Sequence, residues 1–185
     1  MKRQSSIKRS LVLILPVVLI FFISFSLLWG DEPEKKGKDV DFIWHKYDQG
    51  LKKAEKEKKH LLVYFFTNYC GYCRKMEKNT FSDQKVKEVL NSDYVSVRVD
   101  GGSRNKIKFN GAQITERELA SKYRVRGYPA SWFLKPDGEK IAPLMGYTPP
   151  ERFLVVLEYV KDGAYEKMTF SEYLEKKKEV GKSKK

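Results

Sequence analysis

Cysteine and histidine are scarce in this sequence: two cysteines and two histidines occur among 185 residues. The cysteines, Cys70 and Cys73, are separated by two residues, so a bridge between them closes a very short loop and stabilises the fold little. The histidines, His45 and His60, lie 15 positions apart, without the close spacing of zinc-finger histidines. The sequence therefore disfavours a purely structural disulfide and a metal site, and we expect no resident metal or cofactor.

No nucleic-acid-binding motif accompanies the basic composition, although the formal net charge is +13. A basic surface can bind nucleic acid, anionic lipid or acidic proteins. Without a motif, solvated lysines are the favoured interpretation, and we expect no nucleic-acid partner. The composition is 41% hydrophobic and 14% aromatic, which is enough for a packed core and excludes a disordered chain.

Charge is absent from residues 10–29, SLVLILPVVLIFFISFSLLW. Basic residues precede this stretch and the acidic DEPE follows it, a pattern that predicts export of everything after Gly30. A signal-peptide apolar region is about 7–15 residues long and a membrane span about 20, so an uncleaved anchor and a cleaved signal both remain open. We therefore expect a periplasmic protein, either soluble or tethered to the inner membrane by residues 10–29.

The chain divides into segments of different composition, and it contains no internal repeat. Residues 1–30 form the signal peptide or anchor, and residues 31–38, DEPEKKGK, form a charged linker. One globular domain is expected over residues 39–165, followed by a basic C-terminal helix or tail over residues 166–185.

Helical and strand patterns alternate within the domain. Apolar residues at helical spacing from Val40 through Tyr47 to Ala54 predict a helix, and the apolar run 61–66 predicts a strand buried on both faces. Later segments are predicted from capping, turn and alternation signals: helices at 74–78, 83–91, 115–123, 151–160 and 169–178, strands at 94–99, 130–134 and 140–144, and a hairpin turning at Asn110-Gly111. This order predicts an α/β fold with a mixed, mainly parallel central sheet flanked by helices.

The two cysteines follow the first central strand, within FFTNYCGYCRKM at residues 65–76. There Cys70 begins a helix, where free backbone N–H groups and the helix dipole stabilise a thiolate. Cys73 lies about one helical turn away, within reach of a mixed disulfide formed at Cys70. Between them, Gly71 leaves room for another chain and Tyr72 offers an aromatic contact. The pattern predicts a catalytic redox pair.

From Leu61 to Val160 the chain resembles the thioredoxin superfamily. The resemblance rests on LLVYFF before CGYC, on YVSVRVD, on ELASKYRVRGYPA and on WFLKPDGEKIAPLMGY. It implies a thioredoxin-like fold and a protein thiol–disulfide oxidoreductase that exchanges disulfides with protein partners. It also implies that Pro129 follows a cis peptide bond and that the backbone of Tyr128 pairs with a bound substrate strand.

Two further features refine the resemblance. The insert before ITERELASKYRVRGYP is most similar to exported bacterial proteins of the SoxW type, which favours a reductase kept reduced by a membrane electron donor. Thioredoxins commonly place an acidic residue six positions before the first cysteine, where this chain has Tyr64.

Other functions stay open at this point: a disulfide oxidase or isomerase, a thioredoxin-like copper or haem-maturation chaperone, and a tethered binding module with an inert bridge. Met76 lies near the pair, but its helical spacing favours a core position over a metal ligand. The enzymatic hypothesis requires that neither sulfur lies deep in the interior or on a metal ion.

Overall fold

The computed structural model describes residues 42–183, so the charge-free stretch 10–29 and the linker 31–38 lie outside the described part. None of the helices in residues 42–183 is both long and apolar enough to cross a lipid bilayer. The elements follow in the order β1 (Trp44–His45), α2 (Tyr47–Glu57), β2 (His60–Phe66), α3 (Gly71–Asn79), α4 (Gln84–Asp93), β3 (Tyr94–Asp100), β4 (Lys106–Phe109), β5 (Ala112–Thr115), α5 (Glu116–Lys122), β6 (Ala130–Leu134), β7 (Lys140–Met145), α6 (Pro150–Lys161), the 3₁₀ turn η1 (Ala164–Glu166) and α7 (Phe170–Ser183).

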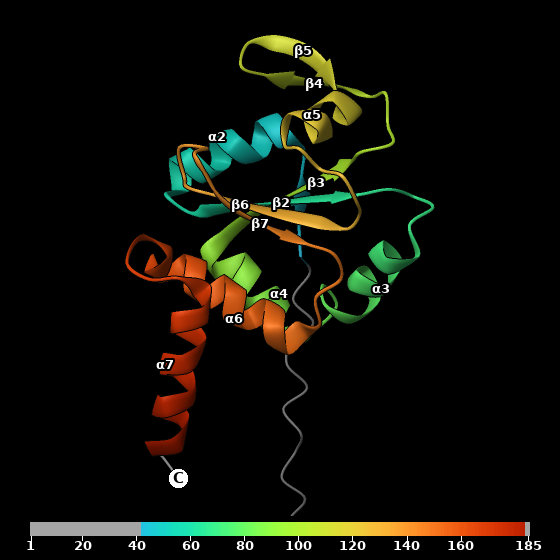
Figure 1. The fold of residues 1–185 in the computed structure, drawn as a ribbon. Helices are drawn as coiled ribbons and strands as arrows, with labels where there is room; N and C mark the ends of the chain where they lie inside the picture. The colour runs from blue at the N-terminus through green and yellow to red at the C-terminus, as the bar shows by residue number, and fades with distance from the viewer. Residues whose placement is uncertain (1–41, 184–185) are drawn as a thin grey trace, which may run out of the picture. The chain divides into compact units, whose positions relative to one another are not determined.

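A five-stranded sheet in the order β1-β3-β2-β6-β7 forms the centre of the domain (Figure 1). β3 pairs in parallel with β1 and β2, whereas β6 pairs antiparallel with β2 and β7. The mixed sheet is confirmed, but the expectation of a mainly parallel one is wrong. The Pro136-Asp137-Gly138 turn joins β6 and β7 directly as a hairpin, which makes this half of the sheet antiparallel.

Helices cover both faces of this sheet. Alternate residues of β2 point to opposite faces, so Val63 and Phe65 pack with α2 and α5, while Leu62 and Tyr64 pack with α4 and α6. β2 is buried on both faces as predicted, because it lies between β3 and β6 in the layered fold. Figure 1 shows α2 and α5 on one side of the sheet and α4 and α6 on the other, with α3 at one end.

Local signals place several element boundaries correctly. The Asp83 side chain accepts a hydrogen bond from the Val86 N–H and caps α4. Thr115 and Glu118 form the predicted capping box of α5. The β4–β5 hairpin turns at Asn110-Gly111, whose φ angles of 48° and 81° are those that a two-residue type I′ turn requires.

The predicted helix that begins near Val40 is wrong in its first part. Val40 lies outside the described residues, Trp44 and His45 form β1, and α2 begins only at Tyr47. The Trp44 ring stacks on Tyr64 at 5.5 Å between centroids, so pairing with β3 buries an aromatic ring that helical spacing assigned to a helix face. Ile43, expected on the buried stripe, is 64% exposed. Helices α3 and α7 occur where predicted but run longer, over Gly71–Asn79 and Phe170–Ser183.

Candidate redox site

Cys70 and Cys73 follow the carboxyl end of the central strand β2, at the start of α3. The Cys70 N–H donates to the Thr67 carbonyl oxygen at 3.1 Å, which closes a tight turn between strand and helix. Cys70 is the N-cap of α3, with the extended backbone typical of that position. The sequence places the pair correctly at a helix N-terminus.

The two cysteines are joined by a disulfide, with their Cα atoms 5.2 Å apart. The backbone N–H of Cys73 donates to Cys70 Sγ at 3.1 Å. This N–H belongs to the first turn of α3, where backbone donors have no partner within the helix. The N-terminus of α3 is therefore aimed at the sulfur of Cys70.

The two residues differ in accessibility. Cys70 is partly exposed at the surface, whereas Cys73 is 1% exposed. The expectation that neither sulfur lies in the interior is therefore wrong, because Cys73 is buried. A thiol that resolves a mixed disulfide needs only to reach Cys70 Sγ, to which it is bonded here, and burial shields it from other partners.

Tyr64 is fully buried beneath α3, and its hydroxyl donates to the Cys73 carbonyl oxygen at 3.4 Å. Burial raises the pKa of this hydroxyl well above its ordinary value, and the nearby Glu77 carboxylate raises it further. The phenol therefore stays protonated and acts as a donor to the redox helix. The Glu77 carboxylate itself accepts a hydrogen bond from Arg98 Nη2 at 2.7 Å.

The Tyr128–Pro129 peptide bond is cis, as the resemblance implied. The Pro129 carbonyl oxygen accepts a hydrogen bond from Gly146 N at 2.8 Å, which ties this loop to the end of β7. The Tyr128 ring lies against the backbone of Gly101, where an added Cβ would be 2.0 Å from the Tyr128 hydroxyl oxygen. A side chain at Gly101 is therefore compatible with this loop only if Tyr128 moves.

Gly71 and Tyr72 are both exposed, and the Tyr72 side chain is 65% exposed. Tyr69, which the sequence reasoning did not single out, is 80% exposed immediately before Cys70. Large exposed aromatic side chains that cluster at one place mark interaction surfaces more often than chance. The structure thus places aromatic surface on both sides of the exposed cysteine.

A contact that the sequence analysis missed joins the loop before Cys70 to the end of β3. Asn68 Nδ2 donates to Asp100 Oδ2 at 3.0 Å, and Gly102 N donates to Asp100 Oδ1 at 2.9 Å. The signal available from the sequence was positional, because the carboxyl ends of parallel β2 and β3 meet at one edge of the sheet. Asp100 therefore anchors the β4–β5 insertion next to the redox pair.

The histidines do not join the cysteines. His45 lies in β1, and His60 begins β2 with its Nε2 3.3 Å from the Tyr165 hydroxyl oxygen. Within residues 42–183 no group of three or more histidine, cysteine or acidic side chains is arranged to hold a metal ion. Met76 is fully buried in the core, as its spacing predicted.

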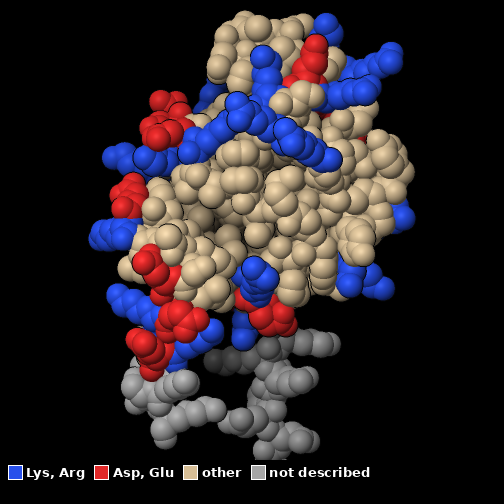
Figure 2. Space-filling model, viewed as in Figure 1, with Lys and Arg blue, Asp and Glu red and all other residues tan. Residues whose placement is uncertain are grey.

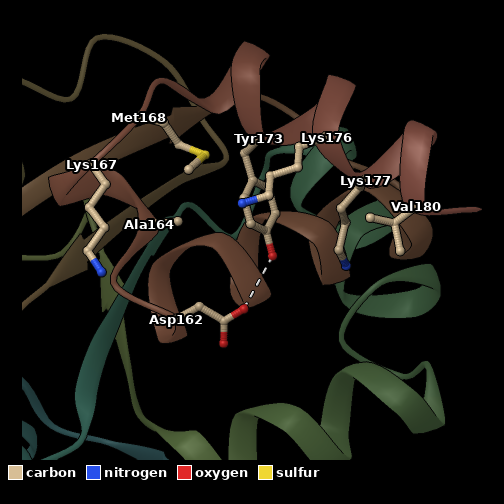
Figure 3. A pocket seen from close by; sticks show the side chains of 8 residues that line it. All are labelled: Asp162, Ala164, Lys167, Met168, Tyr173, Lys176, Lys177 and Val180. Atoms are coloured by element: carbon tan, nitrogen blue, oxygen red, sulfur yellow. Dashed lines mark hydrogen bonds between the residues drawn. The ribbon is translucent and has the colours of Figure 1, made fainter.

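A cavity of about 610 Å³ lies elsewhere, between η1 and α7 (Figure 3). Met168, Tyr173 and Val180 contribute apolar surface, and the Tyr173 hydroxyl donates to Asp162 Oδ2 at 3.3 Å. None of the residues that line it comes from the segments around Cys70, Asp100 or Pro129. This cavity is therefore separate from the redox pair.

The model of the thioredoxin-like domain family matches residues 47–161, which include the pair and the cis-proline loop. The chain belongs to this thioredoxin-like family. A solved thioredoxin from Thermus thermophilus is 30% identical to it, with a TM-score of 0.54 over 64% of this chain and 86% of that one. A thioredoxin-fold protein from Helicobacter pylori is 26% identical, with a TM-score of 0.56 over 67% of this chain and 82% of that one.

Two curated relatives of this thioredoxin-like chain are named for disulfide chemistry. One is the disulfide bond reductase DsbH of Chlamydia pneumoniae, 25% identical over 57% of this chain and 63% of DsbH. The other is the thiol:disulfide interchange protein DsbD of Ralstonia nicotianae, 28% identical over 69% of this chain and 20% of DsbD. A further match, to an Archaeoglobus fulgidus protein, covers 45% of that protein. This chain therefore spans less than two thirds of the length of each of these three relatives. The finer resemblance to SoxW-type proteins stays a prediction.

Proposed function

We propose that this thioredoxin-like protein is an exported thiol–disulfide oxidoreductase that works as a reductase, with Cys70 and Cys73 as its catalytic pair. The observation that carries the proposal is the Cys70–Cys73 disulfide at the N-terminus of α3, with the Cys73 N–H directed at Cys70 Sγ. Once the bridge is reduced, the same backbone donors and the helix dipole stabilise a thiolate on Cys70. The accessible sulfur is then the nucleophile.

The reaction is two successive exchanges. The Cys70 thiolate attacks one sulfur of a partner disulfide, the partner's S–S bond breaks, and one partner thiolate leaves and takes up a proton. Cys73 then loses its thiol proton and attacks Cys70 Sγ, which releases the second partner thiolate and restores the Cys70–Cys73 bond. The partner gains two electrons and the pair loses two, so a dithiol donor must return them before the next cycle.

The residues around the pair are proposed to bind the substrate segment. An extended partner strand would pair with the backbone of Tyr128, beside Pro129. The absence of a side chain at Gly71 leaves the approach to Cys70 open, and the exposed Tyr72 ring provides an apolar contact. These roles follow the family resemblance, and the exposure of Gly71 and Tyr72 supports theirs; Tyr128 is half-buried and Pro129 is buried.

The reductase direction is tested by equilibrating the full-length protein against a series of glutathione buffers and quantifying the oxidised fraction. We expect a midpoint nearer the roughly −270 mV of thioredoxin than the roughly −120 mV of the oxidant DsbA. The name of the relative DsbH as a reductase supports this direction. A midpoint nearer the DsbA value would favour the oxidase or isomerase alternative, and a pair that never cycles would refute the activity.

Export is proposed from the charge pattern around residues 10–29, with residues 31–38 as a linker, residues 39–165 as the catalytic domain and residues 166–185 as a basic tail. In this arrangement a membrane electron donor reduces the pair on the oxidising side of the inner membrane. We expect alkaline phosphatase fused after Lys185 to be active in a bacterial host, because that enzyme requires disulfides formed outside the cytoplasm. An inactive fusion that is expressed at full length would contradict export.

A further inference from the structure

Two basic side chains of α3 lie next to the redox pair. Arg74 Nη1 donates to the Asn68 carbonyl oxygen at 3.2 Å, which holds the guanidinium over the loop that leads into Cys70. Lys75 Nζ lies 4.5 Å from the centroid of the Tyr147 ring, close to the end of β7. Both side chains are exposed, so one side of the site is positively charged.

Basic residues also occur in the segment that leads into the cis-proline loop. Arg124 and Arg126 lie in the α5–β6 connection just before Tyr128, and both are exposed. The Arg117 N–H donates to the Ser103 carbonyl oxygen at 3.1 Å, which holds this residue beside the segment after Gly101, against which the Tyr128 ring packs. We name Arg74, Lys75, Arg117, Arg124 and Arg126 the basic rim.

The basic rim carries more positive than negative charge, although Glu116 and Glu118 flank Arg117 in the sequence and Glu77 follows Lys75 on α3. Among residues 67–76, 100–105, 124–129 and 145–147 the only acidic one is Asp100, and both of its carboxylate oxygens already accept hydrogen bonds. The Glu118 carboxylate, next to Arg117 in sequence, accepts hydrogen bonds from Thr115 in the capping box. The rim is therefore open to an anionic partner.

Most ion pairs within residues 42–183 lie away from the rim. They occur along α2, between α4 and α6, beside the β6–β7 turn and on α7, and the Arg98–Glu77 pair joins β3 to the same helix, α3, that carries Arg74 and Lys75. No ion pair of the described residues includes a member of the basic rim. Figure 2 shows a band of Lys and Arg below the β4–β5 hairpin, in front of α2 and α5, whereas the edge on the side of α3 is mainly uncharged with separate Lys or Arg residues.

From this distribution we infer that the segment docking at the pair is acidic, with Asp or Glu residues flanking the partner's cysteines. The inference rests on the proposed function, since a partner in thiol–disulfide exchange must carry a disulfide or a thiol, which nucleic acids lack and cysteine-containing proteins supply. Opposite charge steers diffusional encounter and discriminates against partners of like charge. The rim thereby selects among disulfides by the charge around them.

The test uses two cyclic peptides with one disulfide each, identical except for flanking Glu in one and flanking Lys in the other. Each is mixed with the reduced full-length protein in a non-ionic detergent, and oxidation of Cys70 and Cys73 is followed by acid quenching and alkylation. We expect the Glu peptide to react at least about tenfold faster at low ionic strength. The ratio should fall toward one as salt shortens the Debye length to about 3 Å at 1 M.

The double variant Arg124→Glu/Arg126→Glu should lower or invert this ratio. The ratio cancels any effect of the substitutions on the reactivity of Cys70, because both peptides react with the same thiol. The matched control Lys52→Glu/Lys56→Glu makes the same charge change on exposed positions of α2 and should leave the ratio unchanged.

Equal rates for the two peptides, or an equal fall of the ratio in both double variants, would overturn the inference while leaving the proposed function intact. A neutral disulfide, 2-hydroxyethyl disulfide, separates the two hypotheses. If the wild-type pair is not oxidised by this compound or by either peptide, the proposed function fails and the inference fails with it.

Discussion

Replacing Cys73 with alanine is expected to convert a transient mixed disulfide into a stable one. The exposed Cys70 still attacks a partner disulfide, but no second thiol remains to release it. When a reduced Cys73→Ala variant is mixed with excess 2-hydroxyethyl disulfide, whose leaving thiol diffuses away, nearly every molecule should carry one covalent hydroxyethylthio adduct that mass spectrometry detects. The wild-type protein should show almost none under the same conditions.

The matched control is Cys70→Ala, which makes the same substitution at the other sulfur. Because Cys73 is 1% exposed, this variant should form adducts at least about a hundredfold more slowly, as buried cysteines react poorly. Adducts that form equally fast in both variants would refute the assignment of Cys70 as the attacking thiol. If neither variant forms an adduct, the result would favour an inert bridge in a binding module.

Truncating Tyr64 to alanine is expected to destabilise the oxidised protein by about 3–5 kcal/mol, the usual cost of removing a large buried aromatic ring. Its ring is fully buried and stacks on Trp44 and Phe66, and it packs edge-on against Phe81 at 4.8 Å between centroids. The variant therefore leaves a cavity directly beneath the redox helix. Urea unfolding monitored by circular dichroism measures the change in the free energy of unfolding.

Two variants make this result interpretable. Tyr64→Phe keeps the ring and removes only the hydroxyl that bonds to the Cys73 carbonyl oxygen, so it should cost about 1 kcal/mol. Tyr72→Ala deletes the same side chain at a position that is 65% exposed and should change stability by no more than about 0.5 kcal/mol. If Tyr64→Ala costs no more than Tyr72→Ala, the packing argument is wrong.

Local signals accounted for much of the fold. The capping box at Thr115, the Asp83 cap and the Asn110-Gly111 turn depend on interactions between residues at most three apart, so a short window of sequence contains both partners. The continuous apolar run of β2 marked a strand buried on both faces. Where helical spacing competed with tertiary pairing, as at Trp44, the local prediction was wrong.

The redox pair could be predicted for the same reason, because its chemistry is encoded in two cysteines one helical turn apart. The contacts that surround the pair could not be predicted from a short window of sequence. The Asn68–Asp100 hydrogen bond, the contact of Tyr128 with Gly101 and the placement of Tyr64 beneath Cys73 join segments that are distant in sequence or depend on which strands become neighbours. Those neighbours are set by sheet order rather than by any local pattern.

The sequence by itself determined the thiol pair, its place at the start of a helix and the order of the helices and strands after β1, because each depends on nearest neighbours and periodicity. Tertiary structure alone decided that Cys73 is buried while Cys70 is reachable, and that Arg74 lies against the loop before Cys70 and Arg117 against the segment after β3. Accessibility and the sum of charges around a point depend on all elements that pack there, and they exist only once the sheet has assembled.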